Sequence, residues 1–189
     1  MSDITRRWIS AQDLLEDALR LAARVLASGF EPEIVVGLWR GGAPVAVALH
    51  EALAFRGVKA AHLPLCTRLY TGIDTRAGSL EIDGIEQLLP LLATRRRVLL
   101  VDDVWDTGIT LCGVMDAIAR LPGERRDVRA ATVWFKPGRN RSTRTPDYQL
   151  HESDDWLVFP HELEGLSVEE LRTHRGQSFV DALLGTSPF

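Results

Sequence analysis

Two kinds of hydrophobic spacing alternate along the chain, and the first is helical. After Ser10, apolar residues recur at every third or fourth position, as on one face of an amphipathic helix. Asp13 follows Ser10 at the spacing of a helix-capping box, and Gly29 and Pro32 are typical of a helix end. The spacing therefore predicts a helix between Ser10 and Gly29. Its apolar positions are Leu14, Leu15, Ala18, Leu19, Ala22, Val25 and Leu26.

The second kind of spacing is a short, continuous apolar run, typical of a buried strand. Residues 34–37 form such a run, a glycine turn follows, and residues 43–55 are apolar and helix-prone. Further along, the sequence predicts strands at 60–65, 98–101 and 130–135, helices at 85–92 and 111–121, and a loop at 68–84. Alternating strands and helices predict an α/β fold, a mostly parallel twisted sheet flanked by helices.

Composition narrows the class of protein. The 189 residues are 46% hydrophobic and 25% charged, which excludes a disordered, collagenous or disulfide-based chain and predicts about one domain. The net charge of −4 disfavours a dedicated partner of nucleic acid or of an anionic membrane. Cys66 and Cys112 have no metal-site or redox spacing, and no segment resembles a signal peptide or a membrane span. We therefore expect reduced thiols and a cytoplasmic protein.

Charge is also uneven along the second half of the chain. Residues 120–144 contain eight basic and two acidic residues, whereas residues 147–170 contain eight acidic residues and no lysine or arginine. Two solvated surfaces that partly neutralise each other account for this pattern. The basic segment nevertheless keeps a nucleic-acid-binding regulatory module open as an alternative.

The segment from Val98 to Leu111 carries the strongest chemical signal. A buried strand delivers Asp102 and Asp103 to its carboxyl end, where ligands bind in open α/β sheets. Asp106 and a Thr-Gly-x-Thr turn follow directly and enter the next helix. Amides at a helix start, with threonine hydroxyls and a glycine, form a phosphate site, and carboxylates suit sugar hydroxyls or hydrated Mg²⁺. A helix start that is merely rich in aspartate explains one carboxylate but not three. A phosphosugar carries both a phosphate group and sugar hydroxyls, so it suits both parts of this segment.

This segment resembles the PRPP (phosphoribosyl pyrophosphate) signature of the type I phosphoribosyltransferases. The stretch 37–44 resembles the pyrophosphate loop of that family, and the likeness runs from about residue 8 to 163. Phe135-Lys136-Pro137 and the stretch 156–160 resemble the base-binding elements of its 6-oxopurine subgroup. Trp39, Trp105 and His161 depart from the usual pattern of the family, which leaves the base preference open.

The resemblance implies a role for each matching residue. Asp106 is expected to be the catalytic base that takes the purine N7 proton, and Asp102 and Asp103 to contact the ribose and organise Mg²⁺, partly through PRPP and water. The implied PRPP-binding set is Asp102, Asp103, Asp106, Thr107, Gly108, Ile109 and Thr110. The implied pyrophosphate set is Arg40, Gly41 and Gly42, and the implied purine set is Lys136, Trp156 and Leu157. The Trp39–Arg40 peptide is a candidate for the non-proline cis bond frequent in the family.

The implied activity is Mg²⁺-dependent transfer of a phosphoribosyl group from PRPP to hypoxanthine, guanine or xanthine in purine salvage, with release of pyrophosphate and a nucleoside monophosphate. The expected organisation is a phosphoribosyltransferase domain at 1–163, with a hood built by the chain ends and a mobile loop at 68–84, then a helical extension at 164–189. A homo-oligomer, a dimer or a tetramer, is implied. A PRPP- or nucleotide-sensing protein of the same fold and a transferase for another base are the alternatives.

Other chemistries lack their motifs. The chain contains no G-x-x-x-x-G-K-[ST] loop, no G-x-G-x-x-G after a strand and no G-x-S-x-G elbow. The five histidines, at 50, 62, 151, 161 and 174, have no zinc spacing.

Overall fold

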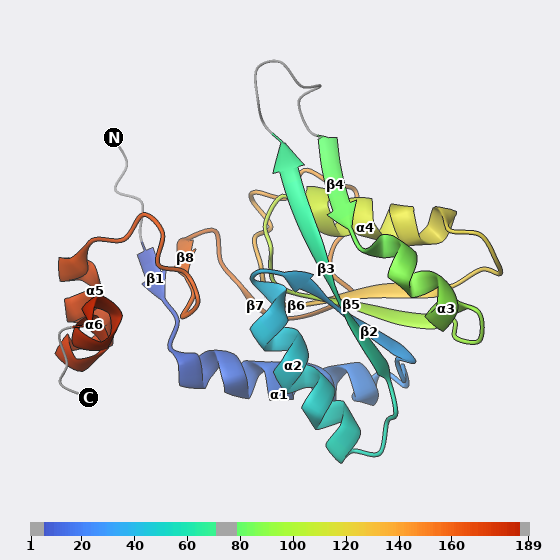
Figure 1. Cartoon of the computed structure of the whole chain (residues 1–189), viewed down its shortest axis with the longest axis horizontal. Helices are drawn as coiled ribbons and strands as arrows, with labels where there is room; N and C mark the ends of the chain where they lie inside the picture. The colour runs from blue at the N-terminus through green and yellow to red at the C-terminus, as the bar shows by residue number, and fades with distance from the viewer. Residues whose placement is uncertain (1–5, 71–78, 186–189) are drawn as a thin grey trace. The chain divides into compact units, whose positions relative to one another are not determined.

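The computed structural model describes residues 6–70 and 79–185, which form two compact units (Figure 1). The core unit is Gln12–Asp154, and the end unit combines Met1–Ala11 with Asp155–Phe189. No helix within the described ranges is both long and apolar enough to cross a membrane.

The core unit is built on a six-stranded sheet in the order β4-β3-β2-β5-β6-β7. Every neighbouring pair is parallel except β3 and β4, which are antiparallel. This confirms the predicted α/β class with a mostly parallel sheet. The strands are β2 (Ile34–Trp39), β3 (Ala61–Tyr70), β4 (Ser79–Asp83), β5 (Arg97–Trp105), β6 (Asp127–Phe135) and β7 (Tyr148–Glu152).

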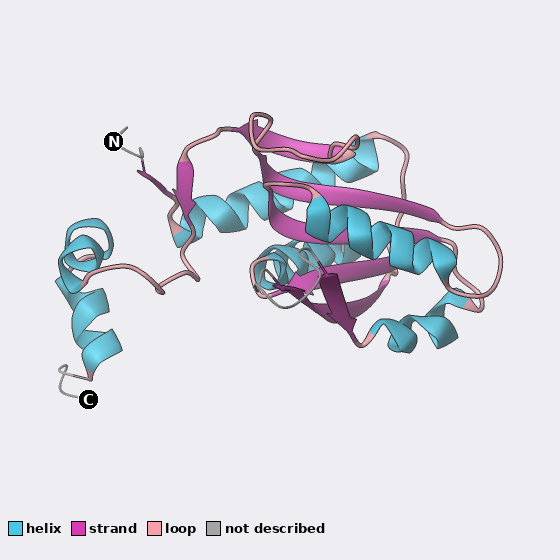
Figure 2. Cartoon of the chain, turned by 90° about the horizontal axis from the view of Figure 1, so that it is seen from above, coloured by secondary structure: helices cyan, strands magenta, loops and turns pink. Residues whose placement is uncertain are grey.

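Helices cover both faces of this sheet (Figures 1 and 2). The helices α1 and α2 lie on one face and α3 and α4 on the other. Successive strand residues alternate between faces, so Val36 and Leu100 pack in one cluster with Val114 of α4. The bounds are α1 (Ala11–Ala27), α2 (Gly42–Phe55), the 3₁₀ turn η1 (Ile85–Gln87), α3 (Leu88–Leu92) and α4 (Ile109–Arg120).

Two predicted boundaries were wrong, for one reason. The strand predicted at 98–101 continues to Trp105, because β5 keeps pairing with β6 through Asp102↔Thr132 and Trp105↔Phe135. Asp102 and Asp103 therefore belong to the strand, and the turn begins only at Asp106. Likewise, the predicted loop 68–84 starts with the end of β3 and closes with β4, while residues 71–78 lie outside the described part. Pairing between strands outweighed the weak strand preference of these polar residues.

The end unit joins segments from opposite ends of the sequence. Strand β1 (Arg6–Trp8) pairs in parallel with β8 (Trp156–Val158), and α5 (Val168–Arg175) and α6 (Gln177–Leu184) follow. Helix α5 begins with a capping box, in which the side chains of Ser167 and Glu170 each bond to the backbone amide of the other residue. The division at residue 163 stays a prediction.

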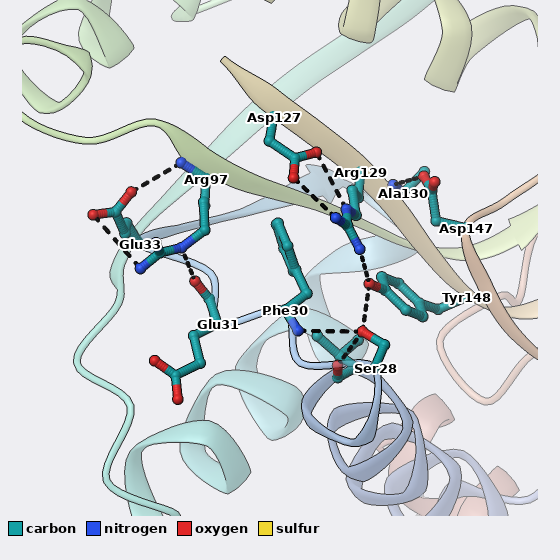
Figure 3. Close-up of polar contacts among 11 residues, drawn as sticks. Ser28, Phe30, Glu31, Glu33, Arg97, Asp127, Arg129, Ala130, Asp147 and Tyr148 are labelled. Carbon is teal, nitrogen blue, oxygen red and sulfur yellow. Dashed lines mark hydrogen bonds and ion pairs between the residues drawn. The ribbon is translucent and has the colours of Figure 1, made fainter.

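At the amino ends of the core strands, polar groups are paired with one another (Figure 3). Arg129 on β6 donates to both carboxylate oxygens of Asp127 and, at 2.7 Å, to the hydroxyl of Tyr148. That hydroxyl lies 2.8 Å from Ser28 Oγ just after α1, and the guanidinium of Arg129 stacks 4.3 Å from the centre of the Phe30 ring. These contacts tie the end of α1 to β6 and β7.

Glu33, just before β2, is also paired at the amino ends of the strands. Its carboxylate accepts hydrogen bonds from the backbone amides of Arg96, at 2.8 Å, and Arg97, at 3.0 Å. These two bonds lower the pKa of Glu33 below its ordinary value, although partial burial opposes them. The ionised form of Glu33 is therefore stabilised by the fold.

Candidate active site

The predicted site residues of the core unit, apart from Lys136, lie at the carboxyl ends of β2 and β5, the two central strands. From β2 the chain continues to one side of the sheet, into β3, and from β5 it continues to the other side, into β6. Such a point of reversal is where open α/β sheets bind ligands. The fold thus places residues 40–42, after β2, beside residues 102–110 on and after β5.

The glycines after β2 lie directly against the β5 carboxylates. A Cβ atom on Gly41 would be 2.3 Å from Asp103 Oδ2, and one on Gly42 would be 2.3 Å from the carbonyl oxygen of Val101. A side chain at Gly42 would require the backbone to move, and one at Gly41 would require the Asp103 carboxylate to move. The Trp39–Arg40 peptide is cis, as the resemblance implies. The structure therefore brings the predicted pyrophosphate loop and the predicted ribose carboxylates into contact.

Two adjacent carboxylates of β5 have different environments. Asp103 is 5% exposed, and Asp102 is partly buried. Asp102 accepts hydrogen bonds from the amides of Asp103, at 3.1 Å, and Gly42. Burial and, next, the charge of Asp103 nevertheless raise the pKa of Asp102 well above its ordinary value. Two like charges are thus held close together with less water than they would have on the surface.

The turn after β5 has the geometry of an anion site. Gly108 adopts a positive φ of 77°, and helix α4 begins at the next residue. Thr107 Oγ1 accepts a long hydrogen bond of 3.4 Å from the amide of Ile109. A hollow of about 80 Å³ is lined by Asp102, Asp106, Thr107, Gly108 and Thr110 among others. Helix-start amides and hydroxyls around such a hollow suit a phosphate group.

Asp106 lies between two cationic side chains. Lys136, the first residue after β6, has its Nζ 3.6 Å from Asp106 Oδ2 and is 6% exposed. Arg139 donates from Nε to Asp106 Oδ1 over 2.6 Å. The predicted catalytic base, Asp106, and the predicted purine contact, Lys136, are thus adjacent. They lie together because β6 pairs with β5 up to Trp105 and Lys136 donates its amide to the Trp105 carbonyl.

Trp105, a departure from the family pattern, is a buried structural residue in this chain. Its side chain is 1% exposed, and Nε1 donates to Asn140 Oδ1 over 3.1 Å. The same oxygen accepts from the backbone amide and hydroxyl of Ser142. Sequence reasoning missed Arg139 and Asn140, because only the basic character of residues 120–144 signalled that segment.

The other two predicted purine contacts belong to the end unit. Trp156 opens β8 and is half exposed, whereas Leu157 is buried. Their joint role with Lys136 remains a prediction.

A larger hollow of the core unit does not coincide with the predicted site residues of that unit. It has a volume of about 380 Å³, lies between α2 and β3, and is lined mainly by apolar side chains, including Trp39, Val47 and Leu63. The chemistry, rather than the size of the hollow, therefore identifies the candidate site. Within the described residues, no cluster of three or more histidine, cysteine, aspartate or glutamate side chains could hold a metal by itself.

Solved structures with the same fold include purine-related proteins. A purine phosphoribosyltransferase from Pyrococcus horikoshii has 23% identity and a TM-score of 0.65, over 86% of this chain and 97% of that one. A xanthine-guanine-hypoxanthine phosphoribosyltransferase from Helicobacter pylori has 19% identity and a TM-score of 0.67, over 90% and 100%. A Neisseria gonorrhoeae protein with bound ppGpp has 16% identity and a TM-score of 0.70, over 95% and 99%.

A comparison with curated protein sequences finds no significant match. The family model described as "Phosphoribosyl transferase domain" matches residues 10–166, which span the whole core unit and include β8. This range contains every residue that the sequence predicted for the site. With its mostly parallel sheet and the loops at the ends of β2 and β5, the chain belongs to the phosphoribosyltransferase family and has the type I fold.

Proposed function

We propose that this protein transfers the 5-phosphoribosyl group from PRPP to a 6-oxopurine and so works in purine salvage. The observation that carries the proposal is the position of Asp106. On one side of it lies the hollow of the Thr107–Thr110 turn, and on the other lies Lys136. This arrangement supports the proposal, because a transfer between a sugar phosphate and a base requires a phosphate site and a base site that meet at one group.

The sugar phosphate end of the substrate suits the residues of β2 and β5. Thr107, Gly108, Ile109 and Thr110 would hold the 5′-phosphate through amides and hydroxyls. Arg40, Gly41 and Gly42 would bind the pyrophosphate, because the two glycines expose amides and the arginine supplies a charged fork. The crowding of both glycines against β5 supports this role, since it fixes the loop beside the ribose carboxylates.

In the transfer, a ring nitrogen of the base forms a bond to the anomeric carbon while the bond to pyrophosphate breaks. Asp106 would accept the proton that the purine loses at N7, because that proton becomes acidic as the base gains positive character. The negative charge of Asp106 would also stabilise the cationic sugar of the transition state. Lys136 would donate to the O6 side of the base, where an adenine amino group would be repelled.

Mg²⁺ fits the carboxylates of Asp102 and Asp103 if it is shared with the substrate. Two hard oxygen ligands satisfy only part of the octahedral shell of the ion, so PRPP oxygens and water would complete it. The pKa of Asp102, raised first by burial and next by the charge of Asp103, supports this assignment, because a divalent cation would stabilise the ionised carboxylate. When bound, Mg²⁺ supplies charge neutralisation for the leaving pyrophosphate.

A panel of bases tests the proposal. The full chain is incubated with Mg²⁺ and PRPP and, separately, hypoxanthine, guanine, xanthine, adenine, orotate and uracil, and the nucleotide formed is measured by chromatography. We expect product with at least one 6-oxopurine. Product with adenine or a pyrimidine alone would show that the assignment of Lys136, Trp156 and Leu157 is wrong.

A nucleotide-sensing protein of the same fold is the second candidate. It is favoured by the bound ppGpp in the structure from Neisseria gonorrhoeae, which aligns over 95% of this chain. Binding of PRPP or ppGpp in calorimetry, without nucleotide formation from any base, would support this candidate over the transferase. A homo-oligomeric, cytoplasmic protein completes the proposal, and sedimentation and fractionation would test those two points.

A further inference from the structure

We propose that Arg139 is a positioning residue that holds Asp106 in the orientation needed for proton transfer. This inference rests on the proposed function, because it assigns Arg139 a part in the same reaction. It concerns a residue that the sequence motifs do not include.

Two cationic side chains hold the Asp106 carboxylate, and one interaction is stronger than the other. Arg139 Nε donates to Oδ1 over 2.6 Å, a distance typical of a short charge-assisted hydrogen bond. Lys136 Nζ is 3.6 Å from Oδ2, beyond the usual length of a hydrogen bond. With Oδ1 engaged, Oδ2 is the oxygen that faces Lys136 and is left to accept a proton.

Arg139 suits this role better than a second lysine would. A guanidinium keeps its proton under all physiological conditions, so it cannot compete with Asp106 as the acceptor. Its planar shape also orients the carboxylate, whereas an ammonium group acts as a point charge.

The backbone of the loop that carries Arg139 is fixed at both ends. The Gly138 amide donates to Asp154 Oδ1 over 2.9 Å, and a Cβ atom on Gly138 would lie 2.6 Å from the other oxygen of that carboxylate. The Arg139 amide donates to the Lys136 carbonyl over 3.2 Å, which forms a tight turn. Lys136 and Arg139 therefore approach Asp106 from a single rigid turn.

Beyond Arg139, the loop is attached to the phosphate turn itself. The Arg141 amide donates to the carbonyl of Thr107 over 2.9 Å, and the indole of Trp105 donates to Asn140. Because the backbone of Arg139 is fixed on both sides, only the rotamer freedom of its half-exposed side chain is lost when it holds Asp106. An ion pair between two residues on loose backbone would lose more entropy and contribute almost nothing.

The test compares steady-state kinetics of the wild type with Arg139→Ala, Arg139→Lys and the control Arg125→Ala. Arg125 is exposed, lies between α4 and β6, and carries the same charge. We expect Arg139→Ala to lower kcat about tenfold, the effect of losing one charge-assisted hydrogen bond at a partly exposed site. The KM for PRPP should stay within about twofold, Arg139→Lys should restore part of kcat, and Arg125→Ala should match the wild type.

A double-variant cycle separates positioning from a general structural effect. If Arg139 acts through Asp106, Arg139→Ala should have no further effect on kcat in an Asp106→Asn background. An independent, additive loss, an unchanged kcat in Arg139→Ala, or a rise in kcat would overturn the assignment while the wild type remains active. A wild type that forms no nucleotide from any base would instead overturn the proposed function, and the role of Arg139 with it.

Discussion

Carboxylates at the two ends of the core sheet have pKa values that are shifted in opposite directions. At the amino ends of the strands, carboxylates meet donors: Asp127 pairs with Arg129, and Glu33 accepts two backbone amides. At the carboxyl ends, Asp102 and Asp103 stand side by side, and two glycines crowd against them. The pKa of Glu33 is accordingly lowered, whereas that of Asp102 is raised.

This difference indicates that the amino end stabilises the fold, and it supports the proposal that the carboxyl end binds a ligand. A lowered carboxyl pKa means that folding favours the ionised form, and a raised one means that folding opposes it. A raised carboxyl pKa is typical of functional sites, because a bound ligand can stabilise the ionised carboxylate. Variants at the two ends should therefore separate activity from stability.

The largest expected effect is on turnover at the carboxyl end. Asp106→Asn should lower kcat by about 10²–10⁴, because the amide cannot accept the base proton, and PRPP affinity should change only a few-fold. Kinetics and calorimetry measure the two quantities. Glu124→Gln, at an exposed partner of Arg96, is the matched control and should keep full turnover. Unchanged turnover in Asp106→Asn would remove this residue from the base role.

The next effect comes from the crowded glycine after β2. Gly42→Ala should lower kcat/KM for PRPP at least about a hundredfold, since the loop must move away from Val101 and Asp102 and misplaces the bound diphosphate. Gly57→Ala is the control, because no atom lies within 4 Å of its Cβ position, although its φ of 88° makes the change cost about 1 kcal/mol of stability. Equal kinetic losses in both variants would contradict the assignment of the pyrophosphate loop.

At the amino end, the expected loss is in stability alone. Tyr148→Phe removes the hydroxyl shared by Arg129 and Ser28 and should lower the free energy of unfolding by about 1–3 kcal/mol. The kcat per folded molecule should not change. Urea denaturation and kinetics on the same sample measure both, and a selective loss of kcat would break the contrast between the two ends.

The smallest effects concern pH, and they have opposite signs at the two ends. Glu33→Gln should destabilise the protein at pH 7 by about 1 kcal/mol, because the ionised carboxylate accepts two amides. The folded pKa of Glu33 is lowered, so its contribution is complete above the ordinary value of roughly 4.3 and is lost as the pH falls through the folded value.

Asp102→Asn should instead stabilise the metal-free chain at pH 7, because it removes a charge that burial and the neighbouring Asp103 disfavour. Its folded pKa is raised, so the cost of the charge is present above that pKa and disappears as the pH falls through it towards about 3.9. Urea denaturation between pH 4 and 8 with a chelator present tests both variants. Asp102→Asn less stable than the wild type at pH 7 would contradict the electrostatic argument.

The sequence predicted the fold and the candidate site to different depths. The apolar runs predicted the central strands, and the motif after Val98 predicted the turn and α4, because both signals lie within a few neighbouring residues. The end of β5 was misplaced, since the pairing of Trp105 with Phe135 is invisible locally. Strands β1, β4, β7 and β8 were missed because each is short, and β1 and β8 pair with each other across roughly 150 positions.

The partners of Asp106 show the same limit within the site. Lys136 could be predicted through the resemblance, because it follows a strand in a recognisable motif. Arg139 could not, since its contact with Asp106 spans 33 positions and depends on the turn at Gly138. Trp105 looked anomalous in sequence, and its burial in the hydrophobic core together with its bond to Asn140 accounts for it.

The pairing of β1 with β8 has a consequence for synthesis. Arg6 is aligned with Trp156, so the first strand of the end unit must wait for roughly 150 further residues before its partner exists. At about 5–20 residues per second, that wait is on the order of ten to thirty seconds on the ribosome. The core unit, whose sequence lies between the two strands, can fold during this interval. Trp156 and Leu157 enter their strand last, so the nascent chain completes the turn that we propose for phosphate before the strand that we propose for the purine base.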